Sequence, residues 1–177
     1  MRALALILFF ISLPLMAQSA MNTRPAMAPK MATAYANKTE AKVIEFFGYL
    51  ELLTDPKLNT EMKTQVKQQA LSLFGNETTI DVPDFFGKKS DSETLEGLLN
   101  KAIAQKQKYR FTLQEISTKP LAETSEPTWI MEYSVSFSAN KIVKLRQLSH
   151  LKEEYKQFGS EKKKVTTLYL AQAEEIK

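Results

Sequence analysis

The segment 128–138 reads TWIMEYSVSFS, in which apolar and polar side chains alternate. Side chains that alternate with a period of two point to opposite faces of a β-strand. One face would carry large apolar groups and be buried, while the other would carry small polar groups and meet solvent. This arrangement is typical of an antiparallel sheet that is covered on one side. The expected inward-facing side chains are Trp129, Met131, Tyr133, Val135 and Phe137.

Two further segments alternate in the same way and predict additional strands. They are residues 108–114 and residues 165–171. A loop that contains Pro120 and Pro127 is expected between the first two strands, because proline has no backbone N–H to donate to a ladder. The lysine run 162–164 is expected in a turn with its side chains in solvent.

Residues 142–158 fit two patterns. Leu145, Leu148 and Leu151 recur at a spacing of three, which suits one face of a helix. Val143, Leu145 and Leu151 also share the parity of a long strand with one buried face. Periodicity favours the helix, but consistency with the neighbouring strands favours the strand. We therefore expect residues 142–158 to form a strand.

Helical spacing dominates the chain before residue 104. A first helix is expected from Asn37, which forms a capping-box pattern with Glu40, to the Asp55-Pro56 pair. A second is expected from Asn59 or Thr60 to Gly75. Their expected buried faces are Val43, Phe46, Phe47, Leu50 and Leu53 in the first helix, and Met62, Val66, Ala70, Leu73 and Phe74 in the second.

A third helix is expected after a short β-prone run at residues 78–82. Ser90 and Glu93 form a capping-box pattern before an apolar stripe that ends at Ile103. The order of elements predicts an α+β fold, in which three N-terminal helices pack on a curved antiparallel sheet of about four to five strands.

Two segments of the chain resemble a known superfamily. FFGYLELLTDPKLNTEMKTQVKQQALSLFGN (residues 46–76) resembles the opening helical pair of exported NTF2-like (SnoaL-like) proteins from Bacteroidetes-type bacteria, and VTTLYLAQ (residues 165–172) resembles their closing strand. The resemblance extends over about residues 37–176. It implies a cone of helices and bent sheet around a pocket. That superfamily contains enzymes, ligand binders and assembly subunits, so the resemblance does not choose among these roles.

The first twenty residues have the three parts of a Sec signal peptide. Arg2 gives a positive start, residues 3–16 form an apolar run too short for a membrane span, and small residues follow at 17–20. Cleavage is expected after Ser19, with cleavage after Ala17 or Ala20 as alternatives. The expected product is periplasmic or secreted and is not an integral membrane protein.

The mature chain is expected to contain one domain. Residues 21–38 contain two prolines and show neither helical nor strand periodicity, so we interpret them as a flexible leader. A partner-docking segment is the alternative. Residues 39–177 would then form a single NTF2-like α+β domain. Its length lies within the range of one domain.

Composition narrows the range of chemistry. The chain has no Cys, which excludes thiol catalysis, Cys-ligated zinc and iron–sulfur clusters. It has one His, so a zinc site is not expected, and no cofactor is predicted. Its 24 basic residues are interspersed with 20 acidic ones. This balance does not indicate a nucleic-acid partner.

The candidate site residues come from the predicted sheet. Tyr109, Trp129 and Tyr133 would line a pocket if the sheet encloses one, since their polar tips can orient a ligand. Packing in the core is the favoured alternative for all three. His150 has an unperturbed pKa near neutrality and is a candidate general base, although a surface position is favoured.

Two functions from different classes fit these residues. The favoured hypothesis is an exported, non-catalytic binding or accessory module. It would hold a small apolar ligand in a conical pocket or dock on an envelope protein. The alternative is a SnoaL-like isomerase, cyclase or hydratase that acts on a hydrophobic small molecule. Neither hypothesis fixes the oligomeric state.

Overall fold

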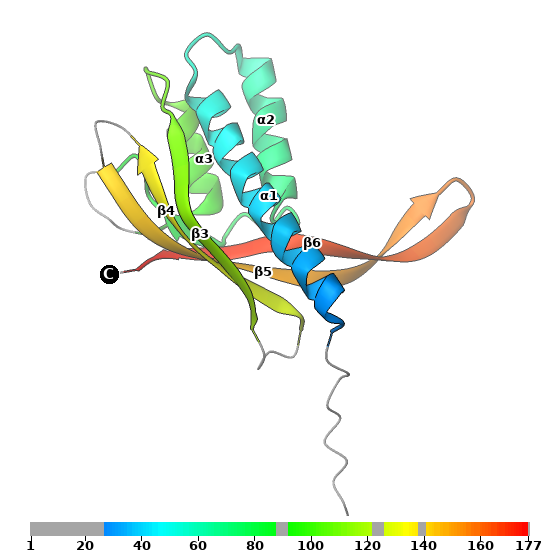
Figure 1. Cartoon of the computed structure of the whole chain (residues 1–177). Helices are drawn as coiled ribbons and strands as arrows, with labels where there is room; N and C mark the ends of the chain where they lie inside the picture. Colours follow the sequence, from blue (N-terminus) through cyan, green and yellow to red (C-terminus); the bar gives the residue numbers. More distant parts are fainter. Residues whose placement is uncertain (1–26, 88–91, 122–125, 138–140, 177) are drawn as a thin grey trace, which may run out of the picture.

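A computed structural model describes residues 27–87, 92–121, 126–137 and 141–176. It has three N-terminal helices, two short strands and four long strands, and the helices lie on one face of the long-stranded sheet (Figure 1). The predicted α+β class and helix-on-sheet arrangement are confirmed. The predicted signal peptide at residues 1–20 lies outside the described residues. No helix in the described part of the chain is long and apolar enough to cross a membrane.

The second and third helices each begin at a residue whose side chain caps the helix. α2 spans Thr60–Ser72, and the side chain of Asn59 accepts a hydrogen bond from the backbone N–H of Met62 at 2.8 Å. α3 spans Leu95–Ile103. Its cap is Thr94, whose hydroxyl accepts from the Gly97 N–H at 3.1 Å. The predicted cap at Ser90 is therefore wrong, and Ser90 itself lies outside the described residues.

α1 spans Pro29–Thr54 and begins eight residues before the expected start at Asn37. Ala28 precedes it without a side-chain cap, so the predicted Asn37 capping box is wrong. The expectation of an irregular leader is also wrong for residues 29–38. Proline is compatible with the first helical turn, and the alanine-rich residues that follow favour a helix. The early turns also pack on the sheet through Tyr35 and Ala36.

The main sheet is antiparallel, with strand order β3-β4-β5-β6. β3 spans Phe111–Leu121, β4 spans Thr128–Phe137, β5 spans Lys141–Phe158 and β6 spans Glu161–Glu175. Residues 142–158 therefore form a strand, as consistency with the sheet predicted. The last strand is longer than the predicted 165–171 at both ends, and it includes the lysine run that was expected in a turn.

β3 differs from the expected strand in both position and length. It runs through Pro120, which was expected in a loop. An edge strand tolerates proline because one side of its backbone needs no ladder partner. β3 begins only at Phe111 because the N–H of Tyr109 donates to the Thr54 hydroxyl and that of Phe111 donates to the Glu51 carboxylate. The end of α1 thus binds the chain where the strand begins.

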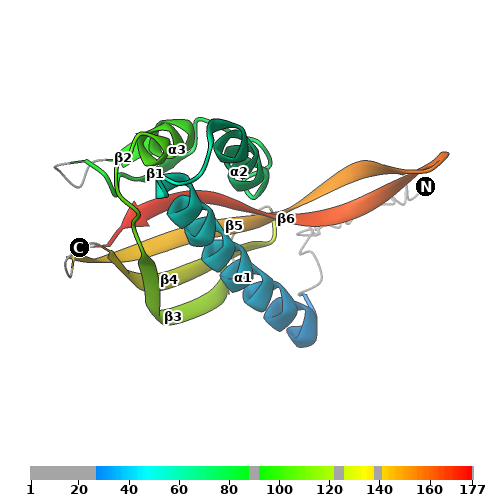
Figure 2. The ribbon, with the colours of Figure 1, turned by 90° about the horizontal axis from the view of Figure 1, so that it is seen from above.

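A small two-stranded sheet lies beside α3. β1 spans Asp81–Pro83, β2 spans Ser92–Thr94, and the two pair antiparallel. β1 lies slightly later in the chain than the predicted β-prone run 78–82. It also contacts β6, so this ribbon stands over the end of the main sheet (Figure 2).

The core fills the space between the helices and the sheet. α1 lies across the sheet and contacts β3, β4 and β6, while α2 and α3 pack against α1. Edge-to-face aromatic pairs run through this core, for example Phe47 of α1 with Tyr133 of β4 at 6.0 Å and Phe46 with Phe74 at 5.1 Å between ring centroids. Met62 was expected to be buried but is exposed on α2. Lys63 is buried in its place, and its ammonium donates to the carbonyl that ends α3.

Candidate functional site

The three sequence-predicted lining residues lie in different parts of the packed interior. Trp129 is 1% exposed, and its indole N–H donates to the Ala32 carbonyl of α1 at 3.3 Å. Tyr133 is equally buried, and burial raises the pKa of its hydroxyl. Tyr109 is half-buried with its ring 5.2 Å from that of Phe86. None of the three lines the cavity described below.

His150 is half-buried in β5, between Thr128 of β4 and Tyr169 of β6 in the ladder. Its ring centroid lies 6.4 Å from that of Tyr169. It is not among the residues that line the cavity. Within the described ranges, no three His, Cys, Asp or Glu side chains are grouped so that they could hold a metal ion.

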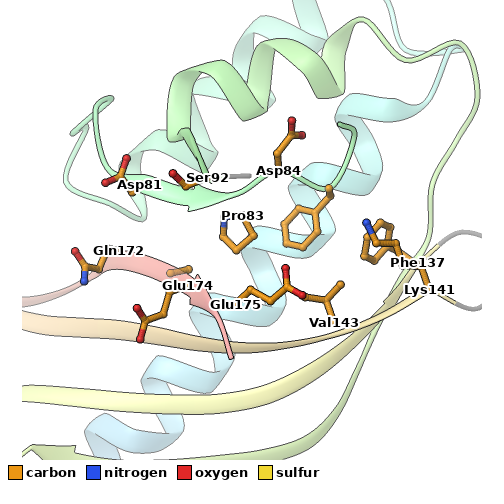
Figure 3. Close-up of a pocket in the computed structure, with 12 residues that line it drawn as sticks. Asp81, Pro83, Asp84, Ser92, Phe137, Lys141, Val143, Gln172, Glu174 and Glu175 are labelled. Carbon is orange, nitrogen blue, oxygen red and sulfur yellow. The ribbon is translucent and has the colours of Figure 1, made fainter. Parts of the chain in front are cut away.

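A cavity of 530 Å³ lies between the β1–β2 ribbon and the paired ends of β5 and β6 (Figure 3). Its apolar wall consists of Phe85, Phe137, Val143 and Ala173, with Pro83 at the side. Carboxylates surround this wall. The charged lining residues are Asp81, Asp84, Lys141, Glu174 and Glu175.

Asp84 is the most firmly held of these carboxylates. It accepts from the Lys101 ammonium at 2.7 Å and from the backbone N–H groups of Phe86 and Gly87, each at 2.9 Å. Burial alone would raise the pKa of Asp84, but these hydrogen bonds outweigh burial and lower it. Lys101 also pairs with Glu93 at 2.6 Å. This cluster fixes the ribbon against α3 and keeps Asp84 ionised.

The other charges differ in how well they are neutralised. Glu174 pairs with Arg146 at 3.1 Å. Asp81 and Glu175 have no ion pair with any residue in the described part of the chain. The ammonium of Lys141 lies 5.3 Å from the centroid of the Phe137 ring. The cavity therefore combines an apolar floor with a predominantly acidic rim, which suits an apolar group that has positive charge beside it.

The second distinctive feature is the far end of the β5–β6 hairpin, residues 152–164, which we call the arm. Figures 1 and 2 show it extending past the rest of the sheet and past the helices. Every arm residue is exposed except the half-buried Glu154. Two aromatic side chains are prominent, Tyr155 at 73% exposed and Phe158 at 52%. The arm contains five lysines and three glutamates.

The base of the arm is held by a polar cluster. Glu154 accepts hydrogen bonds from the hydroxyls of Thr167 at 2.6 Å and Tyr169 at 3.0 Å, and it pairs with Lys156 at 2.9 Å. The hydrogen bond from Thr167 and the pairing with Lys156 lower the pKa of Glu154 to about 2. The ammonium of Lys42 on α1 lies 5.9 Å from the centroid of the Tyr169 ring. These contacts fix the direction in which the ribbon leaves the sheet.

Sequence reasoning did not identify the arm or the cavity. The signal for the arm is the polar run after Leu151, where Tyr155 and Phe158 are the large apolar side chains that remain on β5. The cavity has no local signal, because its described walls come from separate parts of the chain: residues 81–85 with 92, residues 137, 141 and 143, and residues 172–175.

Comparison with known proteins gives no match: no family model, no curated protein and no solved structure is similar to this chain at a significant level. The arrangement of N-terminal helices on an antiparallel sheet is compatible with the NTF2-like architecture. The function must accordingly be argued from the arm and the cavity themselves.

Proposed function

We propose that this chain is an exported, non-catalytic accessory module that docks on another protein through the arm. One observation carries the proposal. Tyr155 and Phe158 lie at 73% and 52% exposure on a ribbon that extends beyond the body of the molecule. Aromatic side chains of this kind are enriched in protein interfaces, where they supply much of the binding energy.

The physical state of the arm supports the same proposal. A two-stranded hairpin by itself is marginally stable in water, so a projecting ribbon gains stability when a partner covers it. Both of its edges offer unpaired backbone groups. The cluster around Glu154 holds its base, so less conformational entropy is lost when the tip binds. An exported NTF2-like module, directed by the signal peptide at residues 1–20, is the setting that we propose for this docking.

A small apolar ligand in the cavity is a second proposal. The volume of 530 Å³ lies within the usual range of about 300–1,000 Å³ for ligand sites, and the floor is apolar. The SnoaL-like enzyme remains the weaker alternative, because its candidate base His150 is not among the cavity-lining residues. A docking module needs no such group.

Site-specific photo-crosslinking in the native host tests the docking role. A photoreactive phenylalanine analogue replaces Phe158, and a matched control carries it at Ile44, an exposed apolar position on α1. We expect a protein adduct from position 158 and none from position 44. The crosslinked protein, once purified, should bind the chain saturably, and Phe158→Ser should weaken that binding about tenfold or more. Equal adducts from both positions would argue against docking by the arm.

A further inference from the structure

We propose that the partner of the arm is a second copy of this chain, whose acidic cavity receives Phe158, so that copies assemble head to tail. The proposal rests on the docking role of the arm and names its occupant. The arm and the cavity are two features of the described structure that core and helix packing do not explain. The arm has an exposed aromatic tip with basic neighbours, and the cavity has an apolar floor with an acidic rim, so the two surfaces are complementary.

The two features lie at opposite ends of one hairpin. β5 begins at Lys141 in the cavity wall and ends at Phe158 at the arm tip, while β6 returns to Glu174 and Glu175 in the cavity rim. At about 3.3 Å per residue, the 18 residues of β5 separate tip and cavity by up to about 55 Å. The tip cannot reach the cavity of its own copy, so a Phe158 in this cavity must come from another molecule (Figures 1 and 2).

The cavity suits an aromatic tip in size and surface. Its 530 Å³ exceeds the space that a benzyl group requires and leaves room for part of the ribbon beside it. Phe85 and Phe137 lie in its wall and already pair edge to face at 5.3 Å. An incoming ring can extend this pairing, since aromatic rings prefer edge-to-face or offset contacts.

The charges of the two surfaces are complementary. Three of the arm's lysines pair with its three glutamates, which leaves Lys152 and Lys162 without an ion pair to any described residue. In the cavity rim, the carboxylates of Asp81 and Glu175 likewise have no ion pair with any described residue. The arm thus presents net positive charge to a rim with net negative charge. Such complementarity favours correct encounter, and salt weakens it.

The geometry also sets the form of the assembly. A surface that binds a different surface of the next copy is heterologous, and it produces rings or open chains rather than a closed two-fold dimer. A ribbon tip in a cavity buries little area beside the roughly 1,600 Å² of a standard stable interface. Association is therefore expected at micromolar to millimolar concentrations.

Sedimentation velocity of the exported protein over this concentration range tests the proposal with two variants. The arm variant carries Phe158→Ser and Lys162→Glu. The cavity variant carries Asp81→Lys and Glu175→Lys. All four side chains are exposed, so the fold should survive, and circular dichroism checks this. Ile44→Ser is the matched control, since it also removes an exposed apolar side chain.

We expect the unmodified protein and the control to form dimers and larger species as concentration rises, and high salt to reduce them. Each variant alone should associate about tenfold or more weakly. The equimolar mixture should form dimers and no larger species, because the arm variant keeps an intact cavity and the cavity variant keeps an intact arm.

Three results would overturn the proposal: a monomeric protein at every concentration, a cavity variant that associates like the unmodified protein, or a mixture that behaves as its separate components. The second result would place the tip on another surface, as in a symmetric pairing of two arms. If a different protein is then crosslinked from position 158, the arm still docks on a partner, but the head-to-tail assembly of this chain is wrong. Equal crosslinking from positions 158 and 44 would instead remove the docking function itself.

Discussion

Replacing Tyr35 by alanine should destabilise the protein by about 2–3 kcal/mol. Tyr35 lies in the part of α1 that the sequence suggested was a flexible leader. Its ring centroid is 5.3 Å from that of Trp129, and it is half-buried. A buried tyrosine covers about 150–250 Å², so about 100 Å² returns to water here, worth about 2.5 kcal/mol at about 25 cal/mol per Å². Loss of the ring pair adds about 0.5–1 kcal/mol, and the better helix propensity of alanine offsets about 0.5 kcal/mol.

The assay is urea denaturation followed by tryptophan fluorescence. Trp129 is the single tryptophan, so the emission comes from the residue that Tyr35 contacts and reports on its surroundings. We expect Tyr35→Ala to lower the urea midpoint and to shift the native emission to longer wavelength as water reaches the indole. Met31→Ala is the matched control, because Met31 is exposed on the same helix and its loss should change stability by less than about 0.5 kcal/mol.

If Tyr35→Ala changes the free energy of unfolding by less than about 0.5 kcal/mol and leaves the emission unchanged, residues 29–38 are not docked on the sheet.

Three further predictions concern stability, measured by chemical denaturation. Gly48→Ala should stabilise the protein by about 0.5–1 kcal/mol, because Gly48 is helical and has open space for a methyl group. Gly75→Ala should destabilise it by about 1–2 kcal/mol, because the backbone at Gly75 has φ +67°. A change of the same sign for both variants would contradict this reasoning. Thr39→Val and Ser149→Ala should each cost about 1–3 kcal/mol, because the two buried hydroxyls share a 2.9 Å hydrogen bond, and the double variant should cost less than their sum. Asp84→Asn should destabilise the protein at pH 7. The difference in unfolding free energy between the two proteins should shrink as pH falls below 3.8, because the folded-state pKa of Asp84 is lowered and its contribution is lost once the carboxylate is protonated. A pH-independent difference would argue against an ionic role for Asp84.

Elements whose period is visible in a short window were predictable from the sequence. The alternation in β4 specified its buried face, and the apolar stripe of α3 specified the helix. β5 was harder, because leucines at a spacing of three suit a helix as well. Its state depends on pairing with β4 and β6 along its length, which residues 142–158 do not encode by themselves.

The errors share one physical cause, which is that a partner distant in sequence changes the local outcome. The start of α1 depends on packing against Trp129, about a hundred residues later. Pro120 lies in a strand because β3 is at the sheet edge. Tyr133 is not one of these errors: it is buried in the core, the alternative favoured from the sequence, because helices cover its face of the sheet. The cavity depends on how the ends of β5 and β6 lie beside the β1–β2 ribbon, and no short sequence motif predicts that arrangement.

Native mass spectrometry of the protein purified gently from its own host, beside the Phe158→Ser variant, tests the central claim most directly. If the arm docks on another protein, the unmodified chain should be found with a polypeptide partner, either further copies of itself or a second protein. Phe158→Ser should release that partner and leave a folded monomer. Identical spectra for the two proteins, or a small molecule as the sole companion of both, would contradict the account.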